Sequence, residues 1–325
     1  MKEPEINLEK IKEARERIKG AINKTPCIYS LPLSRITKKE VFLKLENLQV
    51  TQAFKARGNA NKIALLSEKE KNRGVITASS GNHGQGLSLA ALRAGIKAVI
   101  VLPEVAPNIK IEKIKENKAE VIIKGKTYDD ACNYAHSLSK KMGYIYIQSF
   151  DDPDIITGNG SIGLEILEEV PQSQMIICPI GGGGGISGVA LATKQIKSDI
   201  KIVGVEAERS PSMLESIKAG KIIELSSANT FADGIAVRKP GKINFEIVKK
   251  YVDDIVTVSE EEMKSAIFTL AKEAKIVVEG AGASPVASLL SKKVLINNVS
   301  NIVCIITGGN IDMTLFKSIL KDATK

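Results

Sequence analysis

The sequence holds few of the residues that most metal sites and hydrolytic triads require. It has two histidines, His83 and His136, and four cysteines that lie far apart. A zinc site needs several such side chains together, and a Ser-His-Asp mechanism needs a histidine beside its serine. Neither is therefore expected here. Cys178 and Cys304 lie in apolar runs and are expected to be reduced, buried thiols.

Tryptophan is absent and aromatic residues make up only 4% of the chain, so base-stacking side chains are scarce. The formal net charge is +9, but lysines occur singly or in pairs and alternate with glutamates. A dispersed excess of this kind is typical of a solvated surface, so no nucleic-acid partner is predicted. The positive field would still favour an anionic substrate or cofactor.

Long apolar runs are also missing, and none approaches the roughly 18 residues that span a membrane. Residues 1–5 are Met-Lys-Glu-Pro-Glu, a charged stretch without the apolar core of a signal peptide. We therefore expect no membrane association and a cytoplasmic location.

The chain does contain a regular alternation of apolar, strand-like runs and helical patterns. Strands are expected at residues 41–45, 74–78, 97–102, 119–123, 144–147, 175–180, 200–205, 255–258 and 302–306. Helices are expected near residues 7–22, 84–94, 108–117, 127–142, 155–169 and 260–274. This alternation predicts an α/β fold with parallel sheets covered by helices on both faces. No linker-like segment divides the chain, so two domains would have to be interwoven.

The most informative local feature is a run of five glycines, Gly181 to Gly185, between an apolar strand and the start of an apolar helix. Glycine costs conformational entropy on folding, so such a run needs a physical reason. Bare N–H groups at a helix N-terminus form an anion site, which predicts a bound phosphate. The segment Gly183–Gly188 also fits the dinucleotide pattern G-x-G-x-x-G, with Glu206 as its ribose acid, so a nicotinamide or flavin enzyme is an alternative.

Three more polar segments come directly after predicted strands, where parallel sheets bind their ligands. Lys55 comes after a strand and stands among small residues beside Phe54, a setting that suits a reactive amine. Ser79-Ser80-Gly81-Asn82-His83 could be a helix cap or could bind a carboxylate. Thr307 comes after the last strand. A lysine, a phosphate loop, a carboxylate-type loop and a hydroxyl together favour pyridoxal phosphate (PLP) over a dinucleotide.

The chain resembles the serine/threonine dehydratases of the tryptophan-synthase-β-like (fold type II) PLP enzymes, together with serine racemase. The matching motifs span nearly the whole chain and include ENLQ and FKARGN within 46–59, SSGNHG at 79–84, GNGSIGLEIL at 158–167, PIGGGGGISG at 179–188, VGVEAERSPSM at 203–213, ADGIAVRKPG at 232–241, DDIVTVSEEE at 253–262, VVEGAGA at 277–283 and TGGNID at 307–312. The resemblance implies a larger PLP-binding domain, residues 1–66 and 149–325, and a smaller domain, residues 67–148.

The resemblance also implies roles for individual residues. Lys55 should form the Schiff base with PLP, and Phe54 should pack on the cofactor ring. Asn82 should bond the phenolic oxygen of the ring, Gly181 to Gly184 should hold its phosphate, and Thr307 should meet its pyridine nitrogen. The substrate should be bound by Ser79, Ser80, Asn82 and His83.

The implied reaction is β-elimination from L-threonine or L-serine, which gives a 2-oxo acid and ammonia, with Lys55 as general base. Serine racemase or a dehydratase of another hydroxy amino acid, such as 3-hydroxyaspartate, is the alternative, because racemases use a serine at the position of Ser80 as a second acid/base. Racemases also carry a substrate-binding arginine in the region that corresponds to residues 127–133, and this sequence has none there. The family often has Gly-Ser where this chain has Gln52-Ala53, a change that could reshape the pocket.

Two further expectations concern ions and assembly. In metal-dependent relatives a glutamate and an aspartate bind a cation, and the matching positions here are Glu206 and Ser212. A single carboxylate makes a weak divalent or monovalent cation site, so Glu206 is equally well explained as a strand-end acid. The family implies a homodimer or a homotetramer.

Overall fold

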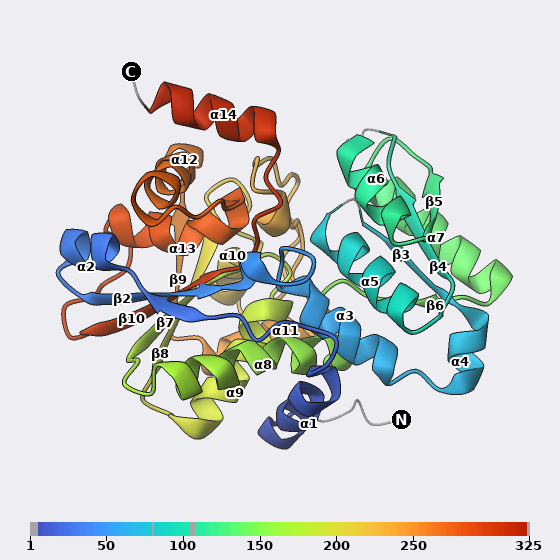
Figure 1. The fold of residues 1–325 in the computed structure, drawn as a ribbon, viewed down its shortest axis with the longest axis horizontal. Helices are drawn as coiled ribbons and strands as arrows, with labels where there is room; N and C mark the ends of the chain where they lie inside the picture. The colour runs from blue at the N-terminus through green and yellow to red at the C-terminus, as the bar shows by residue number, and fades with distance from the viewer. Residues whose placement is uncertain (1–5, 80, 105–107, 324–325) are drawn as a thin grey trace.

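Two sheets organise the protein in the computed structural model, which describes residues 6–79, 81–104 and 108–323 (Figure 1). The larger sheet has six strands in the order β1-β2-β10-β7-β8-β9, and the smaller has four in the order β5-β4-β3-β6. Neighbouring strands are parallel throughout, except for the antiparallel pair β1 and β2. The α/β class with parallel-rich sheets is thereby confirmed. The strands are β1 Cys27–Tyr29, β2 Glu40–Leu45, β3 Val75–Ala78, β4 Ala98–Leu102, β5 Glu120–Ile123, β6 Ile145–Tyr146, β7 Met175–Pro179, β8 Lys201–Ala207, β9 Asp254–Val258 and β10 Asn301–Ile306.

Helices cover both sheets (Figure 1), and the predicted ones are present with small shifts. The first ends at Ile18, earlier than predicted, and the helix expected over 260–274 continues past Thr269 as a π-helical turn, Leu270–Ala274. The α-helices are α1 Leu8–Ile18, α2 Leu31–Thr37, α3 Lys55–Ala64, α4 Glu68–Arg73, α5 Asn82–Arg93, α6 Asn108–Glu116, α7 Tyr128–Met142, α8 Pro153–Glu169, α9 Gly184–Ile196, α10 Ser212–Ala219, α11 Lys242–Tyr251, α12 Glu260–Thr269, α13 Gly280–Leu290 and α14 Met313–Asp322.

The smaller sheet is an insertion into the larger one. Its four strands all come from the chain between β2 and β7, and the chain then returns to complete the larger sheet. The two units are therefore interwoven, with no single hinge peptide between them. The boundary proposed at residues 66/67 falls in the connection between α3 and α4. The boundary proposed at residues 148/149 falls in the connection between β6 and α8.

Three helices beneath the larger sheet are held close together by glycines. A Cβ atom at Gly58 of α3 would lie 2.8 Å from the Ile155 carbonyl oxygen of α8. A Cβ atom at Gly188 of α9 would overlap the Ile156 carbonyl oxygen and lie 2.6 Å from the nitrogen of Gly160, also in α8. Backbone therefore packs directly on backbone, and α8 fixes the position of α3 relative to α9.

A buried ionic network ties α3 to the sheet and to α8. The Arg57 guanidinium, which is fully buried, donates to Glu46 after β2 at 2.7 and 2.8 Å and to Glu165 of α8 at the same two distances. Lys44 of β2, also fully buried, lies 2.7 Å from Glu165 and 3.3 Å from Glu169. Burial alone would raise the pKa of Glu46, but the charge and hydrogen bonds of Arg57 outweigh burial and lower it.

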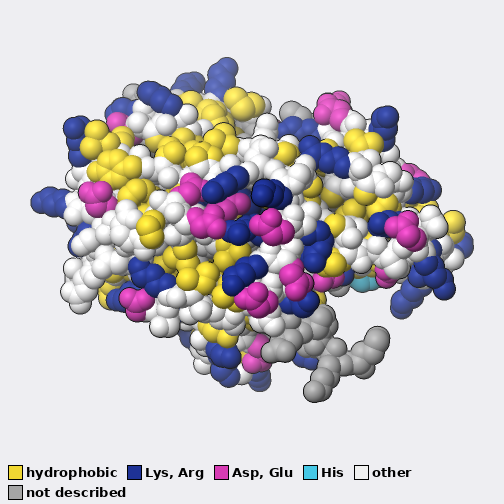
Figure 2. All heavy atoms as spheres, turned by 60° about the horizontal axis from the view of Figure 1, so that its bottom comes forward, with side chains coloured by type: hydrophobic (Ala, Val, Ile, Leu, Met, Phe, Trp, Pro, Cys, Tyr) yellow, Lys and Arg dark blue, Asp and Glu magenta, His cyan; other side chains and the backbone are white. Residues whose placement is uncertain are grey.

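The surface carries mixed charge. On the face shown in Figure 2, Lys and Arg side chains are interspersed with Asp and Glu side chains, as the sequence predicted. Within the described ranges, no helix combines the length and apolar character needed to cross a bilayer.

The α8–α9 contact yields a stability prediction. Gly188→Ala should lower the free energy of unfolding by about 3 kcal/mol, because the new methyl group overlaps the α8 backbone. Gly20→Ala is the matched control, since a Cβ atom there would meet no atom within 4 Å. Urea denaturation followed by circular dichroism measures both. Equal midpoints for the two variants would contradict the close contact.

Candidate active site

Lys55 is the first residue of α3, and the segment before it is fixed against the end of β10. The Phe54 N–H donates to the Thr307 carbonyl oxygen at 3.0 Å, the Gly309 N–H donates to the Gln52 carbonyl oxygen at 2.9 Å, and Ala53 bridges Gly308. Because β2 and β10 are parallel neighbours, their carboxyl ends bring Lys55 and Thr307 together.

The Lys55 amine is held in an environment that favours its neutral form. Its Nζ donates to the Ser149 carbonyl oxygen at 2.7 Å and lies 5.2 Å from the centre of the Phe54 ring. Burial lowers the pKa of Lys55 to about 8. The pKa is therefore far closer to neutrality than that of an ordinary lysine, as a catalytic base requires.

The glycine loop lies directly beside this lysine. A Cβ atom at Gly185 would lie 3.1 Å from the Phe54 ring, and one at Gly184 would lie 2.7 Å from the Phe150 carbonyl oxygen. Ser149 and Phe150 are consecutive, so the same stretch of backbone contacts the Lys55 amine and the loop. Gly183 has a φ of 97°, a left-handed conformation that favours glycine.

The amides of the loop are available to a ligand. Its carbonyl groups are bound from the protein side: Gly182 accepts from Gly241 and Asn244, each at 3.0 Å, and Gly184 accepts from Asn159 at 3.2 Å. By contrast, the N–H groups of residues 181–186 find no acceptor among the described residues. They stand at the N-terminus of α9, where the helix dipole attracts an anion. This arrangement fits a phosphate group.

The loop after β3 forms the start of α5. The Ser79 hydroxyl oxygen accepts the N–H groups of Gly81 at 3.3 Å and Gly84 at 3.2 Å, so this serine fixes the turn that leads into α5. Its O–H hydrogen stays available as a donor. The N–H groups of Asn82 and His83 have no acceptor among the described residues. Ser80 lies outside the described residues.

The imidazole of His83, in the first turn of α5, is uncharged. It is buried, its Nε2 lies 3.4 Å from the Ile147 carbonyl oxygen, and Nδ1 has no partner in the described part of the chain. Burial, with a smaller contribution from the charge of Lys55, lowers the pKa of His83 to about 3. Any contact of His83 with a substrate carboxylate would therefore be a hydrogen bond and not an ion pair.

Asn82 and Thr307 face the same region from opposite sheets. Asn82 Nδ2 donates to Glu279 Oε1 at 2.8 Å, and a Cβ atom at Gly308, next to Thr307, would lie 3.3 Å from Asn82 Nδ2. Thr307 is 6% exposed. Lys55, the glycine loop, Asn82 and Thr307 thus gather at one place, as the sequence predicted.

The sequence analysis did not identify several residues that contact Lys55, the glycine loop or Asn82. Ser149 supplies the carbonyl oxygen that accepts a hydrogen bond from Lys55 Nζ, Phe150 and Asn244 support the glycine loop, and Glu279 binds Asn82. Glu279 stood within the matching motif VVEGAGA, which was the available signal. Gln52 adopts a φ of 57° and its side chain is exposed.

Glu206 caps a helix. Both carboxylate oxygens accept backbone N–H groups at the start of α10, from Met213 and from Leu214, each at 2.8 Å. Burial raises the pKa of Glu206 to about 8, although these two hydrogen bonds act against the rise. Among the described residues, no three metal-binding side chains form a group. Glu206 is fully buried and both of its carboxylate oxygens are occupied by α10, which argues against its use as the ribose acid of a dinucleotide site. A cation at Glu206 stays a prediction.

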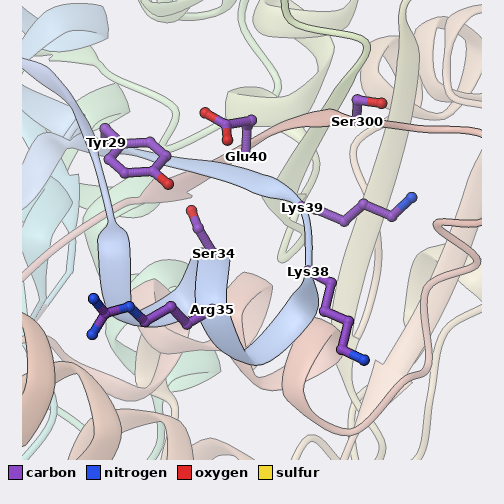
Figure 3. Close-up of a pocket in the computed structure, with 7 residues that line it drawn as sticks. All are labelled: Tyr29, Ser34, Arg35, Lys38, Lys39, Glu40 and Ser300. Carbon is purple, nitrogen blue, oxygen red and sulfur yellow. The ribbon is translucent and has the colours of Figure 1, made fainter.

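A hollow of about 270 Å³ lies elsewhere, at the amino ends of β2 and β10, and Ser300 and Glu40 are among its lining residues. It is separated from the site by the length of these strands. In Figure 3 the side chain of Arg35 points to the opposite side from those of Lys38 and Lys39, so the three cations do not converge on one place.

A strand-end lysine with a lowered pKa, set beside a glycine loop with available amides, defines the class of PLP enzymes. The sequence model of the family described as pyridoxal-phosphate dependent enzyme matches residues 18–308. The chain belongs to this family, and PLP is its cofactor. The residues fit it: the loop amides suit its phosphate, Lys55 its aldehyde and the Thr307 hydroxyl its pyridine nitrogen.

Individual relatives are similar over nearly the whole chain. An L-threonine ammonia-lyase of Thermotoga maritima is 46% identical over 315 residues, covering 97% of this chain and 78% of the relative. The catabolic L-threonine dehydratase TdcB of Staphylococcus aureus is 43% identical over 321 residues, covering 97% and 92%. The structure of maize serine racemase has a TM-score of 0.92 at 35% identity and covers 98% of each chain.

The lowered pKa of Lys55 can be tested by cofactor capture. The cofactor-free protein, mixed with PLP and reduced with borohydride, should incorporate one PLP at Lys55, at a rate that is half-maximal near pH 8. The sign follows because the neutral amine, present above its pKa, is the nucleophile. Mass spectrometry measures the incorporation.

Lys62→Met, on the same helix, is the control and should still incorporate PLP, whereas Lys55→Met should not. Lys62 is paired with Asp152 at 2.8 Å and Asp154 at 2.9 Å, which raise its pKa against the opposing effect of burial. A capture rate that keeps rising to about pH 10 would show that Lys55 has an ordinary lysine pKa.

Proposed function

We propose that this protein is a PLP-dependent ammonia-lyase that converts L-threonine, and L-serine, to a 2-oxo acid and ammonia. The observation that carries the proposal is the Lys55 amine, 2.7 Å from the Ser149 carbonyl oxygen and beside a loop whose amides find no acceptor in the described part of the chain. The names of the relatives from Thermotoga maritima and Staphylococcus aureus support threonine as the substrate. The predicted cytoplasmic location and homodimer or homotetramer belong to the same proposal.

The start of α5 suits the carboxylate of the substrate. The N–H groups of Asn82 and His83 point out of the first turn of a helix, where the dipole favours an anion. The Ser79 hydroxyl can add a donor, and so can Ser80. Held there, the amino acid places its α-carbon between the α5 loop and the lysine.

Lys55 then acts as the base. In its neutral form the Nζ atom takes the α-proton of the amino acid, and the Ser149 carbonyl oxygen holds the resulting ammonium group. Bound PLP withdraws electron density from the α-carbon, which makes that proton acidic. Loss of the β-hydroxyl group as water, followed by addition of water and release of ammonia, turns L-threonine into 2-oxobutyrate.

Thr307 limits the competing chemistry. The Thr307 hydroxyl would meet the pyridine nitrogen of bound PLP and, unlike a carboxylate, would not keep that nitrogen protonated, so negative charge on the α-carbon would be stabilised less. This favours prompt elimination over a long-lived carbanion.

Racemisation of serine, or dehydration of another hydroxy amino acid such as 3-hydroxyaspartate, is the second candidate. The structural similarity to maize serine racemase supports racemisation as this second candidate. It requires an acid on the face of the substrate opposite Lys55, the role proposed for Ser80. The absence of an arginine in residues 127–133 favours the lyase.

The decisive experiment measures the products of purified PLP-loaded protein. With L-threonine we expect 2-oxobutyrate and ammonia in equal amounts, measured by a coupled lactate dehydrogenase assay and by ammonia determination. Lys55→Ala should lower turnover by at least about a thousandfold, since the base is lost. Chiral analysis of L-serine reactions is run in parallel: D-serine without pyruvate would replace the lyase proposal by the racemase.

A further inference from the structure

The side-chain amide of Asn82 is held on both of its ends. Asn82 Nδ2 donates to Glu279 Oε1 at 2.8 Å, and Asn82 Oδ1 accepts from Asn310 Nδ2 at 2.8 Å. A carboxylate can only accept in such a bond. The nitrogen of the amide must therefore face Glu279 and its oxygen must face Asn310.

The side-chain amide of Asn310 is also oriented by a charged group, here the cation of Lys113. Lys113 Nζ, which can only donate, lies 3.0 Å from Asn310 Oδ1. This leaves Asn310 Nδ2 to face Asn82 Oδ1 and the Thr51 carbonyl oxygen, which it reaches at 2.9 Å. The two amides and their charged ends form one directed chain, Lys113 to Asn310 to Asn82 to Glu279, in which no amide can flip without breaking a bond to a charge.

The chain also joins the two sheets across the site. Lys113 lies on α6 and Asn82 on α5, both beside the smaller sheet, while Asn310 follows β10 and Glu279 precedes α13 on the larger one (Figure 1). Glu279 and Asn82 lie against the backbone just beyond Thr307: a Cβ atom at Gly308 would be 2.5 Å from Glu279 Oε1.

We propose that Lys113, Asn310 and Glu279 are positioning residues that fix the Asn82 amide with its nitrogen toward the cofactor. This inference rests on the proposed function of Asn82. Asn82 Nδ2 has two hydrogens, and it donates one of them to Glu279 in a hydrogen bond. The second is left to bond the phenolic oxygen of PLP. A flipped amide would present Oδ1 there instead, and two acceptors would repel each other.

Asn310→Asp tests the direction of the chain at nearly constant size. An aspartate can still accept from Lys113, but it cannot donate to Asn82 Oδ1 and it places negative charge beside that oxygen. The Asn82 amide should then turn or lose its partner. We expect PLP to dissociate about tenfold more readily, the cost of one lost hydrogen bond, and the absorption maximum of bound PLP to shift.

Lys113→Met removes the cation that orients Asn310 and should weaken PLP binding about threefold. Lys115→Met, an exposed lysine on the same helix, is the matched control and should leave PLP affinity unchanged. PLP affinity is measured by equilibrium dialysis, the spectrum by absorption, and the folding of the cofactor-free variants by thermal unfolding. Asn310→Ala, which adds no charge, should weaken PLP binding less than Asn310→Asp does.

An Asn310→Asp protein with wild-type PLP affinity and an unshifted spectrum would overturn the positioning role. So would equal effects of Asn310→Asp and Asn310→Ala on both quantities, because a merely structural role does not distinguish a donor from an acceptor. These outcomes are separate from failure of the proposed function, in which the wild-type protein itself would release no oxo acid from L-threonine.

Discussion

The position of Lys55 depends on the buried ionic network around Arg57. Arg57 is two residues beyond Lys55, and its guanidinium is bound to acids from both the sheet and α8. Removing one member would leave a charge buried without its partner, which costs several kcal/mol. The first turn of α3 is therefore held in place, although it carries a reactive amine.

Glycine contacts between helices then set the position of Lys55 relative to the glycine loop. Glycine contacts keep α3 on α8 and α8 on α9, so the start of α9 stands at a fixed distance from the start of α3. The lysine comes from one of these helix starts and the phosphate loop from the other. Burial also lowers the pKa values of Lys55 and His83, so that His83 is uncharged and Lys55 reaches its neutral form closer to neutral pH than an ordinary lysine does.

The strands other than β1 were predicted from the sequence because they contain apolar runs, whereas β1, Cys27–Tyr29, is too short to show such a run. Asn82, Thr307 and the glycines were found because each follows closely on a strand, and Lys55 because it lies in the connection after β2; the structure brings them together. The helix that begins at Lys55 was missed because its face is made of alanine, glycine and asparagine, which give no apolar period. Glu279, Asn310 and Ser149 were missed because each acts through a partner far away in the chain, which no local pattern reveals.

The strand order has a consequence for biosynthesis. The last strand, β10, occupies a central place in the larger sheet, between β2 and β7. Until residues 301–306 have left the ribosome, β2 and β7 have no common neighbour, and the residues that surround the lysine stay apart. Pairings between such distant segments form slowly. A nascent or truncated chain that ends before β10 would thus lack the central strand and Thr307, so the complete site can form only after β10 has been synthesised.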